Sequence, residues 1–449
     1  MENKKVVRAP WWVALIAFWW FIKNADGLFR WLSKRGELVK FYIFHRPCFV
    51  FNHPELIQQV MVGELREKYD AVTEAMGPLA LLIGKTGVLT MPSGPRHKVG
   101  RTALRGRLHG EGLNSSAVVM REEAARVMRE LVQRARDGQP FDMANLLHAF
   151  TMRTLARATF GAELSAETIA ATREAVESGL KKTFPRTQQP FGWPLLWQAR
   201  FRKNIRTLDE IIGKLIRDAI LTGRWEKGQD TLSALLQNYF AGEMFAEEVI
   251  DNLKNLFIAG HETTATALRW AIKTLSERPD LYDWLSAEVE VARERALNIE
   301  DRSRLPRIWA FIDEVMRLTP TAPRLARTAI ETHEVWGIKI PRESIIFFSA
   351  LDIQRNDELW GRDACQFRPS RFLEKDGEAR QRLKWAFFPF GGGNRRCLGE
   401  AFALFEMATF LIALIESGLK LLLIPQPLRI VSGFTRKLES LRMTCYAEA

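Results

Sequence analysis

The residues best suited to chemistry lie in a short loop near the carboxyl end of the chain. There, glycines at 391–393 precede Arg395, Arg396 and a single cysteine, Cys397. Neighbouring cations and the amino end of a following helix lower the pKa of a thiol and favour the thiolate. The glycines would let backbone N–H groups approach the sulfur. We therefore expect Cys397 to be a stabilised thiolate at the start of an apolar helix over 398–415.

Three interpretations of this loop are open from its residues alone. A thiolate with no second cysteine or histidine nearby suits a metal already held by another ligand set, and haem iron with an axial cysteine is the main such case. Alternatively, Cys397 is a small buried apolar side chain with surface arginines beside it. A phosphate-binding loop fits less well, because the G-K-[ST] ending and a preceding parallel strand are missing.

The composition describes a large folded protein with a basic surface. The chain has 449 residues, of which 47% are hydrophobic and 26% charged, and these values exclude a disordered or collagen-like chain. Its net charge of +12 suits nucleic acid, an anionic membrane or an acidic protein, and does not choose between them. The four cysteines include no C-x-x-C pair, which excludes a disulfide-built scaffold and disfavours a thiolate zinc site.

Helical patterns predominate and must position the cysteine loop. The longest run covers 246–276 and exceeds the usual length of globular helices. Further helices are expected at 26–35, 113–159, 201–221 and 306–318. A hairpin is expected at 39–52, β-rich stretches at 328–348 and 419–446, and a proline-rich loop at 184–197. Because strands and helices do not alternate, a doubly wound sheet is excluded. We predict a mainly α fold with a small β portion, in one unit over 24–449.

The first 23 residues form a separate segment in this interpretation. Trp11 to Ile22 is apolar and rich in tryptophan, with Lys4, Lys5 and Arg8 before it. A bilayer-spanning helix needs about 20 apolar residues, so a full span is not expected. Tryptophan favours the membrane–water interface, and basic residues attract anionic lipid. The segment is therefore either an interfacial anchor or an apolar first helix packed on the globule.

The cysteine loop resembles the cytochrome P450 family. It matches F-x-x-G-x-R-x-C-x-G at every fixed position, with Phe390, Gly393, Arg395, Cys397 and Gly399. A chance match in a chain of this length is below about 10⁻³ on average residue usage. The resemblance, which spans roughly 24–449, implies a triangular prism of helices around a buried haem b. It also implies that Cys397 is the iron ligand and that the other four residues bind the cofactor.

The long helix carries an acid and an alcohol in the sequence AGHETT at 259–264. This segment resembles the family's A-G-x-[DE]-T-[ST], in which Glu262 and Thr263 would be the catalytic pair that delivers protons. Ala259 and the glycine after it would leave room for a flat macrocycle. A polar kink with Thr263 bonding back to a carbonyl is the open alternative. His261 is interpreted as a packing or surface histidine, because there is no H-E-x-x-H.

Two further motifs agree with the resemblance. Glu314 and Arg317 form an E-x-x-R pair on one helical face, and the segment FRPSRF supplies Arg371. In the family these residues form a buried structural triad. The haem propionates call for cations, and the resemblance offers His97 and Arg101 in an H-x-x-x-R, together with Arg327 and Arg395. Each of these basic residues could instead face water.

The resemblance implies a haem-thiolate monooxygenase that uses O₂ and inserts oxygen into a hydrophobic molecule such as a fatty acid, terpene or steroid. Electrons would come from a separate ferredoxin and its reductase, and the basic surface would suit an acidic partner near Cys397. We expect a cytoplasmic monomer with no nucleic-acid partner and with possible peripheral contact at the inner face of the membrane. The rivals are a haem-thiolate peroxygenase or isomerase, a haem sensor or carrier, and a cofactor-free protein.

An apolar substrate pocket is also expected from the resemblance. Its walls would come from five stretches that are rich in Leu, Phe, Trp and Met. They are Met76–Thr90, Phe184–Trp197, the long helix near Phe257 and Ala259, Thr321–Leu325, and Gly433–Thr435.

Overall fold

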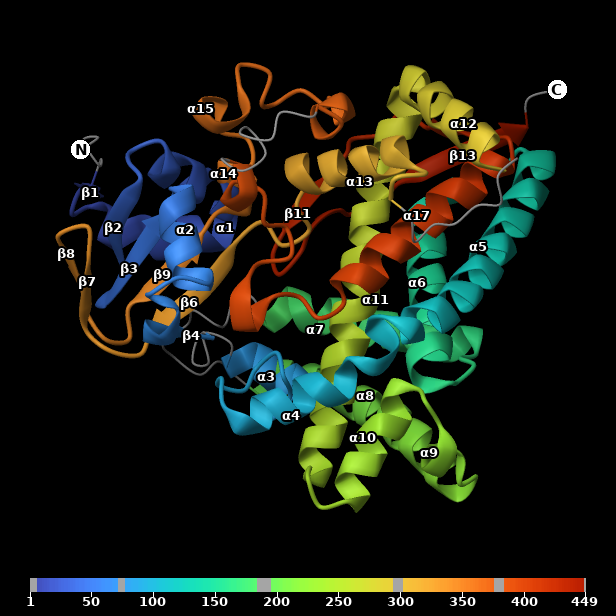
Figure 1. The fold of residues 1–449 in the computed structure, drawn as a ribbon, viewed down its shortest axis with the longest axis horizontal. Helices are drawn as coiled ribbons and strands as arrows, with labels where there is room; N and C mark the ends of the chain where they lie inside the picture. Colours follow the sequence, from blue (N-terminus) through green and yellow to red (C-terminus); the bar gives the residue numbers. More distant parts are fainter. Residues whose placement is uncertain (1–5, 72–76, 184–194, 294–301, 375–382, 448–449) are drawn as a thin grey trace.

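One long helix, α11 (Ala246–Glu277), runs through the middle of the molecule (Figure 1). The computed structural model describes residues 6–71, 77–183, 195–293, 302–374 and 383–447. At the start of α11, Glu248 accepts a hydrogen bond of 2.7 Å from the Phe245 N–H, which satisfies a donor that the helix leaves free. Most side chains of α11 are buried, and they occur on all faces of the helix, as expected of a helix in the core of a large protein.

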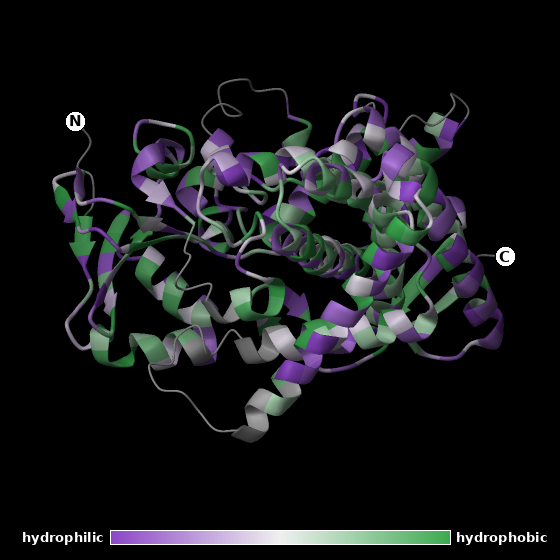
Figure 2. Cartoon of the chain, turned by 90° about the horizontal axis from the view of Figure 1, so that it is seen from below, coloured by the Kyte–Doolittle hydropathy of each residue, from purple (hydrophilic) through white to green (hydrophobic). Residues whose placement is uncertain are grey.

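Other helices surround α11 and confirm the predicted mainly α fold. Against it pack α6 (Met143–Phe160) and α17 (Glu400–Glu416). In Figure 2 many helices carry both hydrophobic and hydrophilic residues, as amphipathic helices do. Further helices are α1 (Val13–Ser33), α2 (Pro54–Met61), α3 (Gly77–Ile83), α4 (Pro95–Leu104), α5 (Glu111–Asp137), α7 (Ala166–Thr183), α8 (Leu195–Leu221), α9 (Arg224–Lys227), α10 (Thr231–Phe240), α12 (Pro279–Arg293), α13 (Pro306–Leu318), α14 (Ala350–Ile353) and α15 (Asp357–Trp360).

The β portion is small and lies at one end of the molecule for the most part (Figure 1). Its main sheet has the order β1-β2-β3-β9-β6-β4, with Phe41 opposite Cys48 in the antiparallel β2–β3 hairpin. These strands are β1 (Val6–Arg8), β2 (Leu38–Ile43), β3 (Arg46–Phe51), β9 (Ile345–Phe348), β6 (Leu325–Ala329) and β4 (Tyr69–Asp70). The smaller sheets are β10 (Leu419–Leu423), β13 (Arg442–Ala447) and β5 (Phe141–Asp142); β11 (Ile430–Ser432) with β12 (Arg436–Leu438); and β7 (His333–Val335) with β8 (Ile338–Ile340).

Helix α1 is interrupted close to the expected division at residue 23. The apolar segment and the helix expected at 26–35 are two helical stretches of α1, separated by the non-helical residue Asn24. Val13, Ala17 and Phe21 point into the core, whereas Trp11, Leu15 and Trp19 are exposed. None of the described helices combines the length and apolar character that crossing a bilayer requires. The segment is thus packed on the globule through one face and leaves a second apolar face uncovered.

Long-range ion pairs hold α1 in place just after its kink. The Asp26 carboxylate lies 2.5 Å from the Arg324 guanidinium and 3.0 Å from that of Arg436. Burial raises the pKa of Asp26, but the two arginines and the Ser432 hydroxyl outweigh this effect and lower it. The side chain is therefore a carboxylate at neutral pH, and it joins the first helix to segments about 300 and 400 residues later.

Most predicted elements are confirmed with small shifts of their ends. The hairpin, the helix at 306–318 and the long central helix appear as expected. The helical stretch at 113–159 is divided into α5 and α6 by the short strand β5. Of the loop expected at 184–197, residues 184–194 lie outside the described residues, and α8 already begins at Leu195.

Candidate active site

The cysteine loop holds its shape through backbone contacts. The Cys397 N–H donates to the Phe390 carbonyl over 2.9 Å, and the Gly399 N–H forms a hydrogen bond to the sulfur. Gly393 has a φ of +64°, and a Cβ there would lie 1.8 Å from the Met61 carbonyl oxygen. Only glycine fits at this position, because the loop passes directly against the end of α2. The loop thus fixes the sulfur just before α17 begins.

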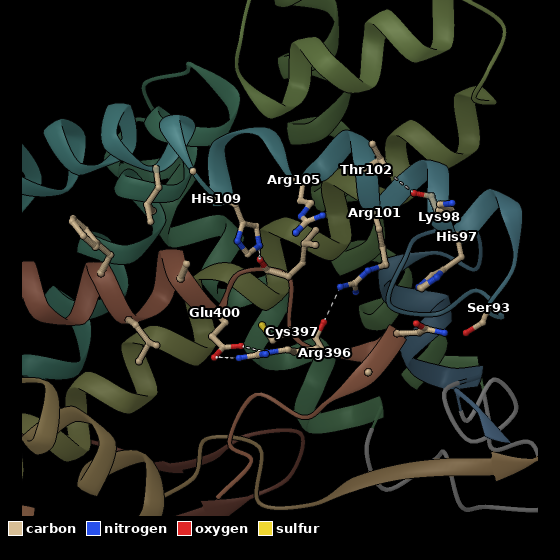
Figure 3. A pocket seen from close by; sticks show the side chains of 18 of the residues that line it. Ser93, His97, Lys98, Arg101, Thr102, Arg105, His109, Arg396, Cys397 and Glu400 are labelled. Carbon is tan, nitrogen blue, oxygen red and sulfur yellow. Dashed lines mark hydrogen bonds and ion pairs between the residues drawn. The ribbon is translucent and has the colours of Figure 1, made fainter. Parts of the chain in front are cut away.

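The Cys397 side chain lines a cavity of about 1150 Å³ (Figure 3). Helix α4 forms one wall and the cysteine loop with the start of α17 forms another. The charged side chains that line the cavity are mostly cationic. Among the lining residues that the structure describes, Glu400 is the one acid, and it pairs with Arg396 over 2.6 Å. The cationic lining residues are Lys98, Arg101, Arg105, Arg302 and Arg396.

The pKa of the Cys397 thiol is raised in this structure, opposite to the expected direction. Burial raises the pKa of the Cys397 thiol, and the charge of Glu400 raises it further. The Gly399 N–H, Arg101 and Arg396 lower this pKa, but they offset only part of the rise. The motif reasoning counted the cations and omitted the larger loss of hydration. Coordination to a metal deprotonates a thiol outright, so a metal ion and not the loop alone would supply the thiolate.

Two arginines near this site lack anionic partners. Arg101 donates to the Arg396 carbonyl over 3.0 Å and Arg327 to the Ala326 carbonyl over 2.8 Å. No carboxylate of the described residues lies within ion-pair distance of either guanidinium. Burial and the neighbouring Arg395 lower the pKa of Arg327 to about 10. Each side chain is still cationic at neutral pH, so both are available to a bound anion.

Arg395 and His97 are engaged with the protein itself. The Arg395 guanidinium lies 2.6 Å from the Asp70 carboxylate and also donates to the carbonyls of Val88 and Met91. It is 3.1 Å from the His97 ring. Burial and the charge of Arg395 lower the pKa of His97 to about 4, so the ring is neutral at pH 7. These contacts tie the cysteine loop to α4, and a direct contact of either side chain with the cofactor stays a prediction.

Helix α11 presents two of the predicted residues at partly open positions. Ala259 and Thr263, four residues apart, are half-buried although most of this helix is inaccessible. The Thr263 hydroxyl donates to the Ala259 carbonyl over 2.7 Å, which is the back-bonded arrangement of the open alternative. The glycine at 260 also lies close to a neighbouring helix: a Cβ there would meet the Leu155 side chain at 2.8 Å. Its small size lets α11 approach α6.

Glu262 points into a buried polar cluster. Its carboxylate lies 2.6 Å from the Lys437 ammonium and accepts a hydrogen bond of 3.2 Å from the Thr435 hydroxyl. Burial raises the pKa of Glu262, yet the neighbouring His148 and Lys437 side chains outweigh this effect and lower it. The group is therefore a carboxylate at neutral pH, one residue away from Thr263.

The structure brings the three members of the predicted triad together. Arg317 donates to both oxygens of Glu314, over 2.6 and 2.8 Å, and Arg371 donates to one of them over 3.1 Å. Glu314 and Arg317 are wholly buried. Arg317 also donates to the carbonyls of Gln354 and Ala364, so the triad joins α13 to the chain that leads to the cysteine loop.

Sequence reasoning missed several residues that support this site. Asp70, the partner of Arg395, and Lys437, the partner of Glu262, stand in segments with no recognisable motif. His148 carries a weak signal, because it is a polar residue in the apolar run LLHAF of α6. Of the predicted apolar pocket walls, Met76 and residues 184–194 lie outside the described residues, and the cavity at Cys397 is a different, cationic space.

A family model decides between the interpretations of the loop. The model for cytochrome P450 matches residues 7–421, which is most of the chain and includes the cysteine loop, α11 and the triad. The chain belongs to the cytochrome P450 family. As a member it is a monooxygenase, and monooxygenases of this family need O₂ and a redox partner and act on small hydrophobic substrates.

Several curated P450 proteins resemble this one over most of their length. Cyclooctatin synthase of Streptomyces melanosporofaciens is 30% identical over 88% of this chain and 85% of its own. Cyclooctat-9-en-7-ol 5-monooxygenase of the same organism is 26% identical over 88% and 84%. Pentalenene oxygenase of Streptomyces avermitilis is 27% identical over 92% and 91%.

The described residues fit the haem-thiolate cofactor that the family implies. Cys397 faces a cavity, Arg101 and Arg327 lack anions, and α11 offers small and hydroxyl-bearing side chains at its open positions. Cys397 would hold the iron and the two arginines the propionates. When bound, the haem supplies the activation of O₂, and its thiolate ligand favours O–O cleavage. The protein's own part would be to place the sulfur, neutralise the carboxylates and deliver protons at Thr263.

Glu406 on α17 provides a test of the core beside the site. Burial raises the pKa of this carboxyl well above its usual value, although the hydroxyls of Thr264 and Thr154 oppose the shift. Such a group binds a proton in the folded state and loses it on unfolding once the pH exceeds about 4.3. The free energy of unfolding should therefore fall as the pH rises above about 4.3 toward the higher pKa of Glu406 in the folded protein. The variant Glu406→Gln should show a smaller fall between pH 5 and pH 8 in denaturant titrations; an unchanged pH dependence would contradict the assignment.

Proposed function

We propose that this P450 binds haem b and inserts one oxygen atom, by hydroxylation or epoxidation, into a terpene-like substrate with electrons from a separate ferredoxin system. The Cys397 side chain, in a cavity that Arg101 also lines, supports the monooxygenase chemistry, and Arg327 is a second arginine without an anionic partner among the described residues. The relatives named for cyclooctat-9-en-7-ol and pentalenene favour terpenes over fatty acids and steroids among hydrophobic substrates.

The experiment is a spectral screen followed by labelled turnover. A terpene alcohol or hydrocarbon that binds near the iron should displace its water ligand and shift the Soret band of the purified holoprotein. Turnover of that compound under ¹⁸O₂ with ferredoxin and its reductase should give a product that is heavier by one labelled oxygen atom. Label from water alone, or no Soret shift with any terpene while a fatty acid gives one, would overturn the corresponding part of the proposal.

The cationic wall of the Cys397 cavity supports docking of an acidic electron donor. Lys98, Arg105 and Arg396 lie along it and are partly or fully exposed, and complementary charge speeds encounter between proteins. Ionic strength should therefore slow reduction by an acidic ferredoxin, because salt screens exposed charges within about 10 Å at 0.1 M. A reduction rate that does not change between low and high salt would remove this support.

The side chain of Thr263 is expected to control coupling of electron use to product. Its hydroxyl stands at an open position of α11, one residue from the Glu262 carboxylate. In the variant Thr263→Ala, the loss of this hydroxyl should lower the product formed per NAD(P)H by about 10²-fold at most, the lower range for a group that transfers protons. The measurement compares NAD(P)H consumed, hydrogen peroxide released and product formed.

Thr274→Ala is the matched control for this change. Thr274 lies on the same helix and makes the same bond, donating to the Trp270 carbonyl over 2.9 Å. If Thr263→Ala and Thr274→Ala lower coupling equally, the effect comes from the shape of α11 and the assignment of a proton-delivering role to Thr263 is wrong.

The outer face of α1 supports peripheral contact with a lipid surface. Leu15 and Trp19 are 68% and 59% exposed on one side of the helix, and Trp11, two residues before the helix begins, is 79% exposed. Phe44, at the turn of the neighbouring hairpin, is also exposed and packs at 4.5 Å from Phe18. Trp at such a surface favours the lipid interface, and Arg8, Lys23 and His45 nearby in sequence would favour anionic headgroups.

Vesicle sedimentation tests this contact. The protein should sediment with phosphatidylglycerol vesicles, and the double change Trp11→Ser with Trp19→Ser should abolish most of the binding. Leu221→Ser is the control, because Leu221 is 83% exposed but lies at the far end of α8. Equal binding of the wild type and the double variant would reject the lipid surface as the partner.

A further inference from the structure

A buried polar cluster surrounds the Glu262 carboxylate, and its other members have no role in the function described above. It joins three helices and one strand: His148 on α6, Glu177 on α7, His261 and Glu262 on α11, and Lys437 on β12. His148, His261 and Glu262 are fully buried, and Lys437 is nearly so. Figure 1 shows α6 and α7 close to the middle of α11.

The cluster forms a continuous line from the surface to Glu262. The Glu177 side chain, which is 23% exposed, lies 3.5 Å from the His148 Nε2 and 3.5 Å from the Lys437 Nζ. The same His148 Nε2 is 3.5 Å from the Glu262 carboxylate, and the same Lys437 Nζ is 2.6 Å from it. His148 and Lys437 each lie between the Glu177 carboxylate and the Glu262 carboxylate.

Several polar atoms of the cluster have no hydrogen-bond partner. These are both ring nitrogens of His148, the Nε2 of His261 and the Oε2 of Glu262. The His261 Nδ1 is occupied by the Phe257 carbonyl at 2.6 Å, so its Nε2 is the lone-pair side. Buried polar atoms are almost always satisfied by protein, water or an ion. Water molecules are the partners that such atoms commonly have in a buried polar cluster.

The ligand atoms of His148, His261 and Glu262 lie within 4.8 Å of one another, which also suits a metal ion. The charges on the facing elements argue against one. Glu177 and Glu262 are already matched by Lys437 and Arg269, and Arg173 lies beyond Glu177. A divalent cation would leave this buried region with two uncompensated positive charges. Ordered water adds no charge and can donate and accept at once.

We propose that Glu177, His148 and Lys437, with ordered water between them, form the route by which solvent protons reach Glu262. This inference rests on the proposed monooxygenase function. Glu177 takes a proton from solvent and gives it to the neutral Nε2 of His148, and the ring gives it to the Glu262 carboxylate. Glu177 is a carboxylate again, His148 is neutral again, and one proton has moved inward. Lys437 is a positioning residue that holds both carboxylates on the line.

Other observations agree with this direction of transfer. Burial lowers the pKa of His148 to about 4 against the opposing effect of Glu177. Burial raises the pKa of Glu177, but His148, Lys437 and Arg173 outweigh this effect and lower it, so both groups rest without the proton and would carry it only briefly. Glu177 is the member of the cluster with the largest exposed fraction, which makes it the entrance. Thr263 follows Glu262 directly, and each proton that it passes on must be replaced from behind.

Glu177→Gln tests the route at its most exposed member. The side chain keeps its shape but no longer takes up a proton, so product per NAD(P)H should fall by about tenfold, less than for a directly acting acid. Glu177→Asp should recover most of this loss. In the resting protein labelled with ¹⁵N-histidine, Glu177→Gln should shift the His148 Nε2 resonance. The control is Glu174→Gln, one turn earlier and exposed, which should change neither coupling nor the resonance.

The outcomes separate the two proposals. If the wild type turns over but Glu177→Gln keeps full coupling and an unshifted His148 resonance, the route is refuted while the monooxygenase function stands. If the wild type gives no oxygenated product from any hydrophobic compound, the function itself fails. One equivalent of non-haem metal in the purified protein, lost in His148→Gln, would show that the cluster is a metal site and would overturn the route.

Discussion

Replacing Glu314 by glutamine is expected to lower the free energy of unfolding by about 3–5 kcal/mol, the range for breaking a buried ion pair. The carboxylate accepts from Arg317, Arg371 and the Arg368 N–H, and Arg317 has no access to water. The amide would leave this guanidinium buried without a counter-charge. Urea unfolding followed by circular dichroism, with the haem content measured in parallel, gives the change.

Glu130→Gln is the control for this prediction. Glu130 pairs with Arg134 over 2.7 Å on α5, but both side chains are more than a third exposed. Solvent screening makes such a pair worth about 0–1 kcal/mol, so its loss should be small. If Glu314→Gln destabilises the protein no more than Glu130→Gln, the triad is not the structural support that its burial indicates.

Replacing Cys397 by alanine is expected to abolish turnover and the spectral signature of thiolate ligation. The wild type, reduced with dithionite and saturated with carbon monoxide, should show the Soret band at the position characteristic of a sulfur-ligated haem. The variant should lack this band, because no other cysteine lines the cavity among the described residues. Product formation should fall to the background of the reductase system alone.

Cys365→Ala separates this effect from a general loss of thiols. Cys365 is exposed and lies outside the cavity, so its removal should leave the band and the turnover unchanged. A thiolate-type band that persists in Cys397→Ala would show that another residue holds the iron, and the assignment of the cysteine loop would have to be abandoned.

Local patterns predicted the helices well where start and stop signals are strong. Pro306 begins α13 and Pro320 follows its end, so this helix was expected at the residues where it occurs. The break in α1 at Asn24 lies beside the expected division, but the anchor at Asp26 was not foreseen, because it depends on Arg324 and Arg436. Such contacts between distant segments leave no periodic trace in the sequence.

The candidate site shows the same difference between local motifs, which the sequence reveals, and contacts between distant segments, which it does not. Cys397 and the triad stand in motifs whose spacing is diagnostic, and the structure brings the triad together. Glu262 was found by its motif, but its partners were not: His148 is a single polar residue in an apolar run, and Lys437 stands in a polar segment without a motif. The pKa of Cys397 was misjudged for a related reason: the cations are visible in the sequence, whereas the degree of burial is a property of the folded chain.

The junction at Asp26 has a consequence for biosynthesis. Its partner Arg436 stands near the carboxyl end of the chain, so the junction can form only after nearly all of the polypeptide has left the ribosome. Until then α1, which has apolar residues on both faces, lacks the ion pair between Asp26 and Arg436. Nascent chains of this protein should therefore be targets for chaperones that bind apolar helices near the amino terminus.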